Sequence, residues 1–572
     1  MRYRAPVDAI RFSLEVHGGL DPALTEGILE EAARFAEQRL APENRRADML
    51  GARFDSGEVT TPPGWTALYR DWAEAGWNGV DLPEAWGGMG LSTRLAAATM
   101  EFWTSACMAF ALGPVLTQGA VDTLEIHGSD ALKALYLPRL VSGEWTATMN
   151  LTEPQAGSDL GLLRSQAEPA GDGSWRIRGS KIFITFGEHD LTENIIHLVL
   201  ARLPDAPEGS KGISLFLVPK FLPDGDGCPG RRNDVACTGI EHKLGIHGSP
   251  TCSMSFGQAG GAIGWLVGEP NRGLACMFTM MNKARLYTGL QGVALAERAF
   301  QHALAFARER KQGRAPGGLT TSAIIDHPDV RRNLLRMRGL TAAGRAIAYR
   351  AAQAIDIAHA GGPGHEQAAE RAALLTPIVK AYGSDLGCEV TSLGIQIHGG
   401  MGYVEETGAA QLFRDARITP IYEGTNGIQA IDLLFRKILR PGSGLAEEMI
   451  GELAATAEAA RSAGLPQLAE ACAEAAPVLA EAIASLRQNA GATERLLGAA
   501  TPFLRLFATG LAMGYLTEAA IVAERRLRAG DSSATCRQAM ADACYFAGNE
   551  AALMTGMARA VMASLPDPDF GP

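Results

Sequence analysis

The stretch MNLTEPQAGSDLG at residues 149–161 marks the point where the pattern of the chain changes. Before it, from Pro22 to about Ala147, apolar residues recur at helical spacing. One such stripe consists of Ile28, Ala32, Phe35, Ala36 and Leu40, and we expect its helix to end near Pro42. After the stretch, apolar runs of strand length are bounded by Gly, Pro and Asp, as in WRIRGSKIFITFG at 175–187. A helical region is therefore predicted to give way to a β domain.

Helical periodicity returns after Gly273 in an Ala-rich run from Ala284 to Arg310, which ends before the GRAPGG loop at 313–318. The PGSG sequence at 441–444 then precedes an Ala-, Leu- and Glu-rich tail. We predict a mostly α protein with a central β domain of barrel or sandwich type, and no βαβ alternation. The predicted domains are a helical domain at 1–147, the β domain at 148–272, a helical bundle at 273–440 and an additional C-terminal helical domain at 441–572.

Composition limits the classes of function. The 572 residues carry a net charge of −11 that is spread along the chain, so composition does not favour a nucleic-acid partner. The nine cysteines never occur as C-x-x-C, which indicates reduced thiols and no metal site. The first residues lack an apolar signal segment, and the apolar stretch from Leu506 contains Glu518, which favours a buried core helix over a membrane span. We predict a cytoplasmic protein without a membrane partner.

Three segments are candidates for chemistry. In the first, residues 149–161, hydroxyl groups and a glycine turn could present hydrogen-bond donors to an anionic or heterocyclic ligand. A surface turn rich in turn-forming residues is the alternative interpretation. In the second, KIFITFG at 181–187, Phe183 and Thr185 lie on one face of a strand because side chains alternate. An aromatic cover and a nearby donor suit a flavin ring, although such a pair can also simply face a core or solvent.

The third segment is ITPIYEGTNGIQAIDLLFRKIL at 418–439, whose apolar spacing predicts a helix capped by Thr425 or Asn426. Glu423 comes just before that helix, and Gly424 leaves room for a ligand to approach. A carboxylate there either acts as a general base or complements the helix dipole.

Taken together and in this order, the strings LTEPQAGSD and IYEGTNGIQ resemble the acyl-CoA dehydrogenase family over residues 1–440. With KLGIHGSPT at 243–251 and the long tail, the chain resembles the larger branch that includes 3-methylmercaptopropionyl-CoA dehydrogenases. The resemblance implies FAD as cofactor and α,β-dehydrogenation of an acyl-CoA thioester to the trans-2-enoyl-CoA, with 3-methylmercaptopropionyl-CoA or a related short or medium acyl-CoA as substrate.

The resemblance also assigns roles to single residues. It places the base at Glu423, since the other site used in the family falls on Ala284. Substrate contacts fall on Ser158, Arg285, Tyr422 and Gly424. FAD contacts fall on Met149, Leu151, Thr152, Ser158, Phe183, Thr185, Arg310, Gln312, Gln396, Gly399, Gly400, Thr425 and Gly427. The chain departs from the common pattern at Asn150 and Leu162, and Phe183 replaces the commoner tryptophan.

In the family, the residues that match Arg310, Gln312, Gln396, Gly399 and Gly400 reach the FAD of a neighbouring subunit, which implies a homodimer or larger assembly. Without the resemblance, Arg310 reads as a cation at a charged helix terminus. Reduced FAD in this family passes its electrons to electron-transfer flavoprotein. The alternatives are an acyl-CoA oxidase of the same fold, which sequence cannot separate from a dehydrogenase, and a flavin-bearing nucleic-acid-binding relative, whose tail would be basic.

Overall fold

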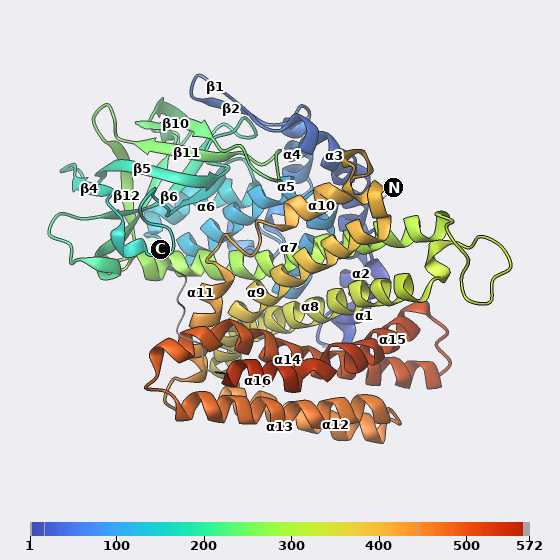
Figure 1. The fold of residues 1–572 in the computed structure, drawn as a ribbon. Helices are drawn as coiled ribbons and strands as arrows, with labels where there is room; N and C mark the ends of the chain where they lie inside the picture. The colour runs from blue at the N-terminus through green and yellow to red at the C-terminus, as the bar shows by residue number, and fades with distance from the viewer. Residues whose placement is uncertain (1–2, 17, 443, 564–572) are drawn as a thin grey trace, which may run out of the picture. The chain divides into compact units, whose positions relative to one another are not determined.

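The computed structural model describes residues 3–16, 18–442 and 444–563 (Figure 1). It is mostly helical with β structure in the middle of the chain, which confirms the predicted fold class. The chain forms two compact units, one of Arg34–Tyr287 and one of Met1–Ala33 with Thr288–Pro572. The boundary between them falls within the long helix α7 (Gly273–Glu309). The finer division into four domains stays a prediction.

Helices in the first half of the Arg34–Tyr287 unit surround one buried helix. They are the π-helical turn η1 (Ala36–Leu40), α3 (Ala41–Leu50), α4 (Trp65–Glu74), α5 (Thr93–His127) and α6 (Asp130–Ser142). The most apolar 18-residue window of α5 is 100% buried. Trp103 of α5 meets the edge of Trp72 of α4 at 4.3 Å between ring centroids, a favourable aromatic geometry. Burial of these rings fixes α4 against α5.

Two features of this region differ from the predictions. The helical stripe was predicted to end near Pro42, but the chain remains helical from Ala36 to Leu50. Pro42 is the second residue of α3 and directly follows the π-helical turn η1, and the helical run continues through it. Strands β1 (Arg53–Asp55) and β2 (Glu58–Thr60) form a hairpin where only helix was predicted. Its turn residues, Ser56 and Gly57, have φ of 54° and 92°, as a tight hairpin turn requires.

The β domain is built around one long strand. Its main strands are β3 (Thr146–Asn150), β4 (Gln166–Pro169), β5 (Trp175–Thr185), β6 (Ile195–Arg202), β7 (Ile213–Pro219), β10 (Val235–Ile240), β11 (Thr251–Phe256) and β12 (Ala262–Val267). The order is β10-β11-β5-β12-β7-β6-β3, with β4 beside β5 and β6. A separate hairpin joins β8 (Phe221–Pro223) to β9 (Pro229–Arg232). The end of β5 pairs with β11 and its start with β12, whereas β3 lies at an edge, parallel to β6.

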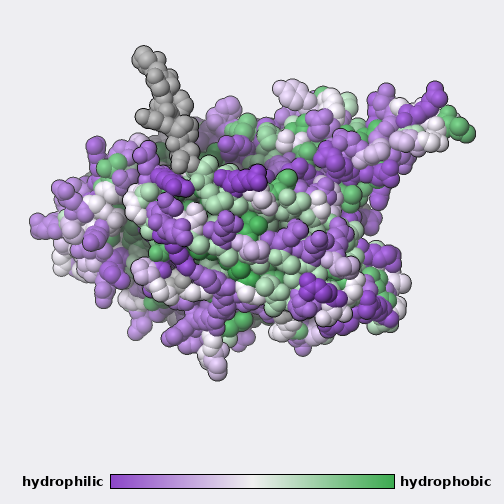
Figure 2. Space-filling view, turned by 60° about the horizontal axis from the view of Figure 1, so that its bottom comes forward, coloured by the Kyte–Doolittle hydropathy of each residue, from purple (hydrophilic) through white to green (hydrophobic). Residues whose placement is uncertain are grey.

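The other unit is a stack of long helices (Figure 1). Besides the second half of α7, it contains α1 (Val7–Val16), α2 (Pro22–Phe35) as far as Ala33, α8 (Pro328–Ala360), α9 (His365–His398), α10 (Ala409–Ala416), α11 (Asn426–Ile431), the π-helix η9 (Asp432–Ile438), α12 (Leu445–Ser462), α13 (Pro466–Gln488), α14 (Thr493–Arg528), α15 (Ala534–Asn549) and α16 (Met554–Met562). The apolar window of α14 is 78% buried, so this stretch is a core helix, as predicted. Hydrophilic side chains cover much of the face in Figure 2.

Helices α7 and α9 cross at unusually close range. A Cβ added at Gly292 of α7 would lie 1.9 Å from the carbonyl oxygen of Gly383 of α9. A Cβ at Gly383 would lie 2.5 Å from the carbonyl oxygen of Gly289, and one at Gly387 would lie 2.5 Å from Cα of Gly292. No side chain fits between these backbones, so the four glycines fix the distance between the helices.

Replacing Gly292 by alanine should therefore destabilise the protein, because the new methyl group must push two helical backbones apart. Overpacking of this kind costs about 1–3 kcal/mol. The matched control is Gly451→Ala in α12, where an added Cβ meets nothing within 4 Å. That change should be neutral or stabilise by about 0.5–1 kcal/mol. Thermal melts of both variants test this, and a Gly292→Ala protein as stable as the control would contradict the packing described.

Candidate active site

The predicted site residues fall into two sets, one in each unit. The Arg34–Tyr287 unit contains Met149, Leu151, Thr152, Ser158, Phe183, Thr185 and Arg285. The other unit contains Arg310, Gln312, Gln396, Gly399, Gly400, Tyr422, Glu423, Gly424, Thr425 and Gly427. Hydrogen bonds bring together the segments at 149–152 and 183–185 of the first set, whereas the second set forms two groups, one at 422–427 and one at the ends of α7 and α9.

In the first set, the segments at 149–152 and 183–185 lie side by side. The Thr148 hydroxyl of β3 donates to the carbonyl oxygen of Thr185 of β5 at 2.6 Å. The N–H of Ile182 donates to the carbonyl oxygen of Thr152 at 2.9 Å. The end of β3 and the end of β5 therefore form one surface, although β3 is an edge strand and pairs with β6 within the described sheet.

Phe183 occupies a β-bulge on that surface. Cys252 of β11 pairs with Ile184, but Met254 pairs with Lys181, so β5 carries one extra residue. Phe183 has a φ of 60°, and its side chain is 58% exposed. Lys181 and Ile184 are both buried with Ile182 and Phe183 between them, so the predicted alternation is interrupted at the bulge, and Thr185 after it is half-buried. The bulge, which sequence did not indicate, leaves an aromatic ring on the surface beside β3.

A buried ion pair supports both segments. The Lys181 ammonium donates to Glu153 Oε1 at 2.8 Å and to the carbonyl oxygen of Leu151 at 3.1 Å. The Glu153 carboxylate also accepts from the N–H groups of Arg164 and Ser165 at 2.7 and 3.0 Å. The side chains of Lys181 and Glu153 are 0% and 4% exposed. The pair thus joins the loop after β3 to strand β5.

Burial and charge act in opposite directions on this pair. Burial raises the pKa of Glu153, but the Lys181 charge and the hydrogen bonds it receives outweigh burial and hold that pKa at about 2. Burial lowers the pKa of Lys181 to about 8, with Glu153 opposing the shift. Both groups are therefore charged at neutral pH.

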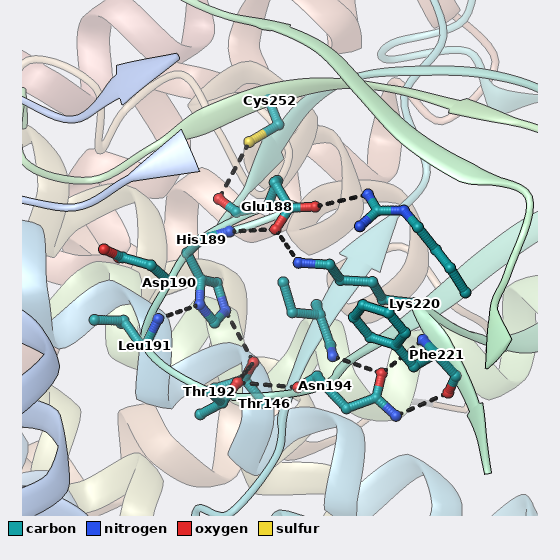
Figure 3. Close-up of polar contacts among 12 residues, drawn as sticks. Thr146, Glu188, His189, Asp190, Leu191, Thr192, Asn194, Lys220, Phe221 and Cys252 are labelled. Carbon is teal, nitrogen blue, oxygen red and sulfur yellow. Dashed lines mark hydrogen bonds and ion pairs between the residues drawn. The ribbon is translucent and has the colours of Figure 1, made fainter. Parts of the chain in front are cut away.

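A second polar network fixes the turn after β5 (Figure 3). Glu188 accepts from Lys220 of the loop after β7, and Arg232 lies 3.7 Å from its other oxygen. His189 accepts from the Leu191 N–H at Nδ1, so its Nε2 donates to the Thr146 hydroxyl at 2.9 Å. Burial lowers the pKa of His189 to about 3, which keeps the ring neutral. The end of β5 is thereby joined to the start of β3.

The remaining members of the first set are less constrained. Ser158 lies exposed in the loop after β3. Arg285 is buried in α7, with its guanidinium 5.4 Å from the ring centre of Phe278. Ala284 beside it is 5% exposed, so a buried methyl group lies next to Arg285 on α7.

In the second set, Glu423 lies in a tight loop before α11. Glu423 and Gly424 have φ of 57° and 82°, two consecutive left-handed residues. Thr425 caps α11 by accepting from the Ile428 N–H at 3.3 Å, which settles the predicted choice of cap. The amide of Gln429 donates to the carbonyl oxygens of Glu423 and Gly424, each at 3.3 Å. The Glu423 backbone is therefore held by its own helix.

The Tyr422 hydroxyl donates to Gln291 Oε1 of α7. Burial raises the pKa of Tyr422 well above its usual value, and the adjacent Glu423 carboxylate raises it further. Tyr422 therefore stays neutral and does not compete with Glu423 as a base.

The other predicted contacts of this unit are exposed and lie near one another. Arg310 and Gln312 follow the end of α7, and Arg310 donates to Gln312 Oε1 at 3.4 Å. Gln396, Gly399 and Gly400 lie at the end of α9. The two helix ends meet where the ring of Phe306 lies 4.5 Å from that of His398. A Cβ at Gly399 or Gly400 would meet nothing within 4 Å, so their backbone is open to a ligand.

Comparisons with known proteins match most of the chain to one family. Residues 24–144, 148–259 and 271–438 match the family models for Acyl-CoA dehydrogenase, N-terminal, middle and C-terminal domains. The 3-methylmercaptopropionyl-CoA dehydrogenase of Ruegeria pomeroyi is 46% identical over 568 residues, covering 96% of each chain. A butyryl-CoA dehydrogenase of Syntrophomonas wolfei is 37% identical over 430 residues, which is 72% of this chain and 70% of its own.

Solved structures share the fold. Caenorhabditis elegans ACDH-11 in complex with C11-CoA has a TM-score of 0.77 at 21% identity and covers 96% of this chain and 91% of its own. Butyryl-CoA dehydrogenase from Megasphaera elsdenii has a TM-score of 0.61 at 26% identity and covers 74% of this chain and 100% of its own.

The ion pair of Glu153 leads to a pH prediction. Because its pKa in the folded protein, about 2, lies below the usual 4.5, the stabilisation is present above about pH 4.5 and is lost as the pH falls towards 2. Glu153→Gln should cost about 3–5 kcal/mol near pH 6, because Lys181 then lacks its counter-charge. The difference in melting temperature from the wild type should shrink on acidification.

The control is Glu168→Gln, which removes an exposed pair with Arg178 whose side chains are 54% and 49% exposed. Its effect should stay below about 1 kcal/mol at every pH. A Glu153→Gln protein whose melting curve parallels the wild type from neutral to acid pH would show that the pair is not ionised in the fold.

Proposed function

This chain belongs to the acyl-CoA dehydrogenase family, and from that membership we propose that Glu423 is the base that removes the α-proton of the thioester. The protein is an FAD-dependent oxidoreductase that introduces a double bond between Cα and Cβ of an acyl-CoA. The assignment is supported by the local structure at Glu423. This residue is a half-buried carboxylate on a left-handed backbone, next to a glycine and at the start of a helix.

Each set, taken by itself, carries features that FAD needs. The isoalloxazine ring needs an apolar cover and backbone partners for its pyrimidine edge, and the exposed Phe183 ring beside the edge strand β3 offers both. Met149, Leu151, Thr152 and Thr185 would border the ring. The pyrophosphate needs cations and an open backbone, which Arg310, Gly399 and Gly400 provide. Gln312, Gln396, Thr425 and Gly427 would complete the cofactor contacts.

When bound, FAD supplies the acceptor for the hydride that leaves Cβ. The proton of Cα goes to the Glu423 carboxylate, which must be ionised and within hydrogen-bond reach of it. Tyr422 is held neutral, with its hydroxyl donating to Gln291, and leaves proton transfer to Glu423. Gly424 has no side chain to obstruct the thioester, while Ser158 and Arg285 would contact the acyl-CoA.

For the substrate we favour 3-methylmercaptopropionyl-CoA. The support is the Ruegeria pomeroyi enzyme, whose 46% identity covers 96% of this chain and thus extends into the additional C-terminal helices. The similarity to a butyryl-CoA dehydrogenase covers only 72% of the chain. Desaturation of this substrate would place the new double bond next to the thioether sulfur.

The wider setting is also a proposal. Reduced FAD must be reoxidised, and electron-transfer flavoprotein is the acceptor we propose. Since Arg310, Gln312, Gln396, Gly399 and Gly400 are exposed together, they are well placed to reach the FAD of a second copy, and we propose a homodimer or larger assembly. We propose a cytoplasmic location, with neither nucleic acid nor membrane as partner.

Glu423→Gln should keep FAD but lose catalysis, because an amide cannot accept the α-proton. Anaerobic addition of 3-methylmercaptopropionyl-CoA should bleach the wild-type flavin, and the variant should be slower by about 10²- to 10⁴-fold. Glu474→Gln, an exposed position on α13, is the control and should bleach at the wild-type rate. Normal bleaching of the Glu423→Gln flavin would assign the base to another residue.

The proposed substrate is tested by comparing acyl chains. The kcat/KM for 3-methylmercaptopropionyl-CoA should exceed that for butyryl-CoA, which lacks one chain atom, by about tenfold or more. Pentanoyl-CoA has the same chain length, with CH₂ in place of sulfur. Comparing its kcat/KM with that of 3-methylmercaptopropionyl-CoA shows whether the enzyme recognises the sulfur or only the length of the chain. A preference for butyryl-CoA would overturn the proposed substrate and leave the reaction class intact.

A further inference from the structure

The loop that carries Glu423 is fastened on both sides to the crossing of α7 and α9, and we propose that Asn426 and Gln291 are positioning residues that hold the base in place for proton transfer. The inference deepens the proposed function and rests on Glu423 being the base. Neither residue needs to touch the substrate, because each acts through the backbone or side chain next to Glu423.

Asn426 is fully engaged with α9. Its Nδ2 donates to Asp385 Oδ1 at 2.7 Å and to the carbonyl oxygen of Ala381 at 3.2 Å. Its Oδ1 accepts from the Lys380 ammonium at 2.8 Å and from the Ser384 hydroxyl at 3.2 Å. The amide group of Asn426 thus uses its nitrogen and its oxygen on one neighbouring helix, which makes a specific attachment.

The attachment is not part of helix capping. Thr425 already caps α11, so the Asn426 side chain has no role in starting its own helix. Its N–H donates to the carbonyl oxygen of Pro420 at 3.1 Å, which closes the loop around Glu423. Displacing Asn426 from α9 would therefore move the loop together with the base.

On the other side of Glu423, the Tyr422 hydroxyl binds Gln291 of α7. Glu423 thus lies in a segment that is held to α7 at Tyr422 and to α9 at Asn426. A residue with a β-carbon is disfavoured in the left-handed region, so a free loop would relax, and the two attachments oppose that relaxation.

The helices that receive these bonds are themselves fixed. Gln291 lies between Gly289 and Gly292 on α7, and Ser384 and Asp385 lie between Gly383 and Gly387 on α9. Those are the four glycines at which the backbones approach too closely for any side chain. The residues that receive these hydrogen bonds therefore lie at the close crossing of α7 and α9, which keeps the loop of Glu423 in a fixed position.

The charges around Asn426 fit the same role. Lys380 is 0% exposed, whereas Asp385 is exposed on α9. Lys380 and Asp385 place a cation and a carboxyl on the two ends of the Asn426 amide, which orients it.

The test compares Asn426→Ala, Asn426→Ser and Gln291→Ala with wild-type FAD-loaded protein. Asn489→Ala is the control, because Asn489 also bonds through both side-chain atoms but lies at the end of α13. Single-turnover flavin reduction is followed anaerobically with 3-methylmercaptopropionyl-CoA carrying deuterium at the α- or the β-carbon. Amide hydrogen exchange of the peptide covering residues 420–429, without substrate, reads the loop directly.

We expect Asn426→Ala to slow flavin reduction by about 10- to 100-fold, since a displacement near 1 Å costs about that much. FAD content and the dissociation constant of the substrate should change less than about threefold. The isotope effect of the α-deuterium should rise relative to that of the β-deuterium, because only proton transfer has been misaligned. Exchange in peptide 420–429 should increase, and Asn489→Ala should resemble the wild type.

Wild-type reduction rate and isotope effects in both Asn426→Ala and Gln291→Ala would overturn the inference. So would a rate loss that only follows loss of FAD or of melting temperature, with the ratio of isotope effects unchanged. If Asn426→Ala does not fold, Asn426→Ser and Gln291→Ala give the same comparison. Failure of the proposed function looks different: Glu423→Gln would then bleach normally, or no acyl-CoA would bleach the wild type.

Discussion

The close crossing of α7 and α9 at four glycines is the constraint on which the position of Glu423 depends. A glutamate with φ of 57° is disfavoured, and the conformation persists only where the surroundings enforce it. Gln429 holds the carbonyl groups of the loop, and α7 and α9 hold its two ends. Those helices cross at four glycines without space for a side chain. The close packing of α7 against α9 therefore fixes the position of the loop that carries the Glu423 carboxylate.

The Arg34–Tyr287 unit also contains a strained backbone position that buried polar contacts stabilise. Phe183 has a φ of 60° and lies in the bulge of β5. The bulge follows Lys181, whose buried ion pair with Glu153 stabilises this part of the strand. An unpaired charge in that position would be costly, so the pair keeps the loop after β3 and the end of β5 together. In each unit an exposed or half-buried side chain that we propose to be functional lies on a strained backbone, and polar contacts next to it maintain the strain.

Much of this could be predicted from sequence, but only where the signal is local. The helix cap at Thr425, the loop at 313–318 and the burial of α14 follow from neighbouring residues and from periodicity. The hairpin at Ser56-Gly57 was missed because two short strands carry little pattern. The end near Pro42 was wrong because a π-helical turn precedes the proline and the helical run continues through it, which the sequence pattern does not indicate. The bond between Tyr422 and Gln291 joins residues 131 positions apart, and the glycine crossing depends on helix geometry. No local pattern indicates either contact.

The most direct test of this account is the position of the Glu423 carboxylate in an experimental structure with FAD and a non-reactive acyl-CoA analogue bound. The account predicts a carboxylate oxygen of Glu423 within about 3.5 Å of the α-carbon, with the left-handed backbone retained. A structure in which another carboxylate occupies that position, or in which Glu423 points away from the bound thioester, would contradict it.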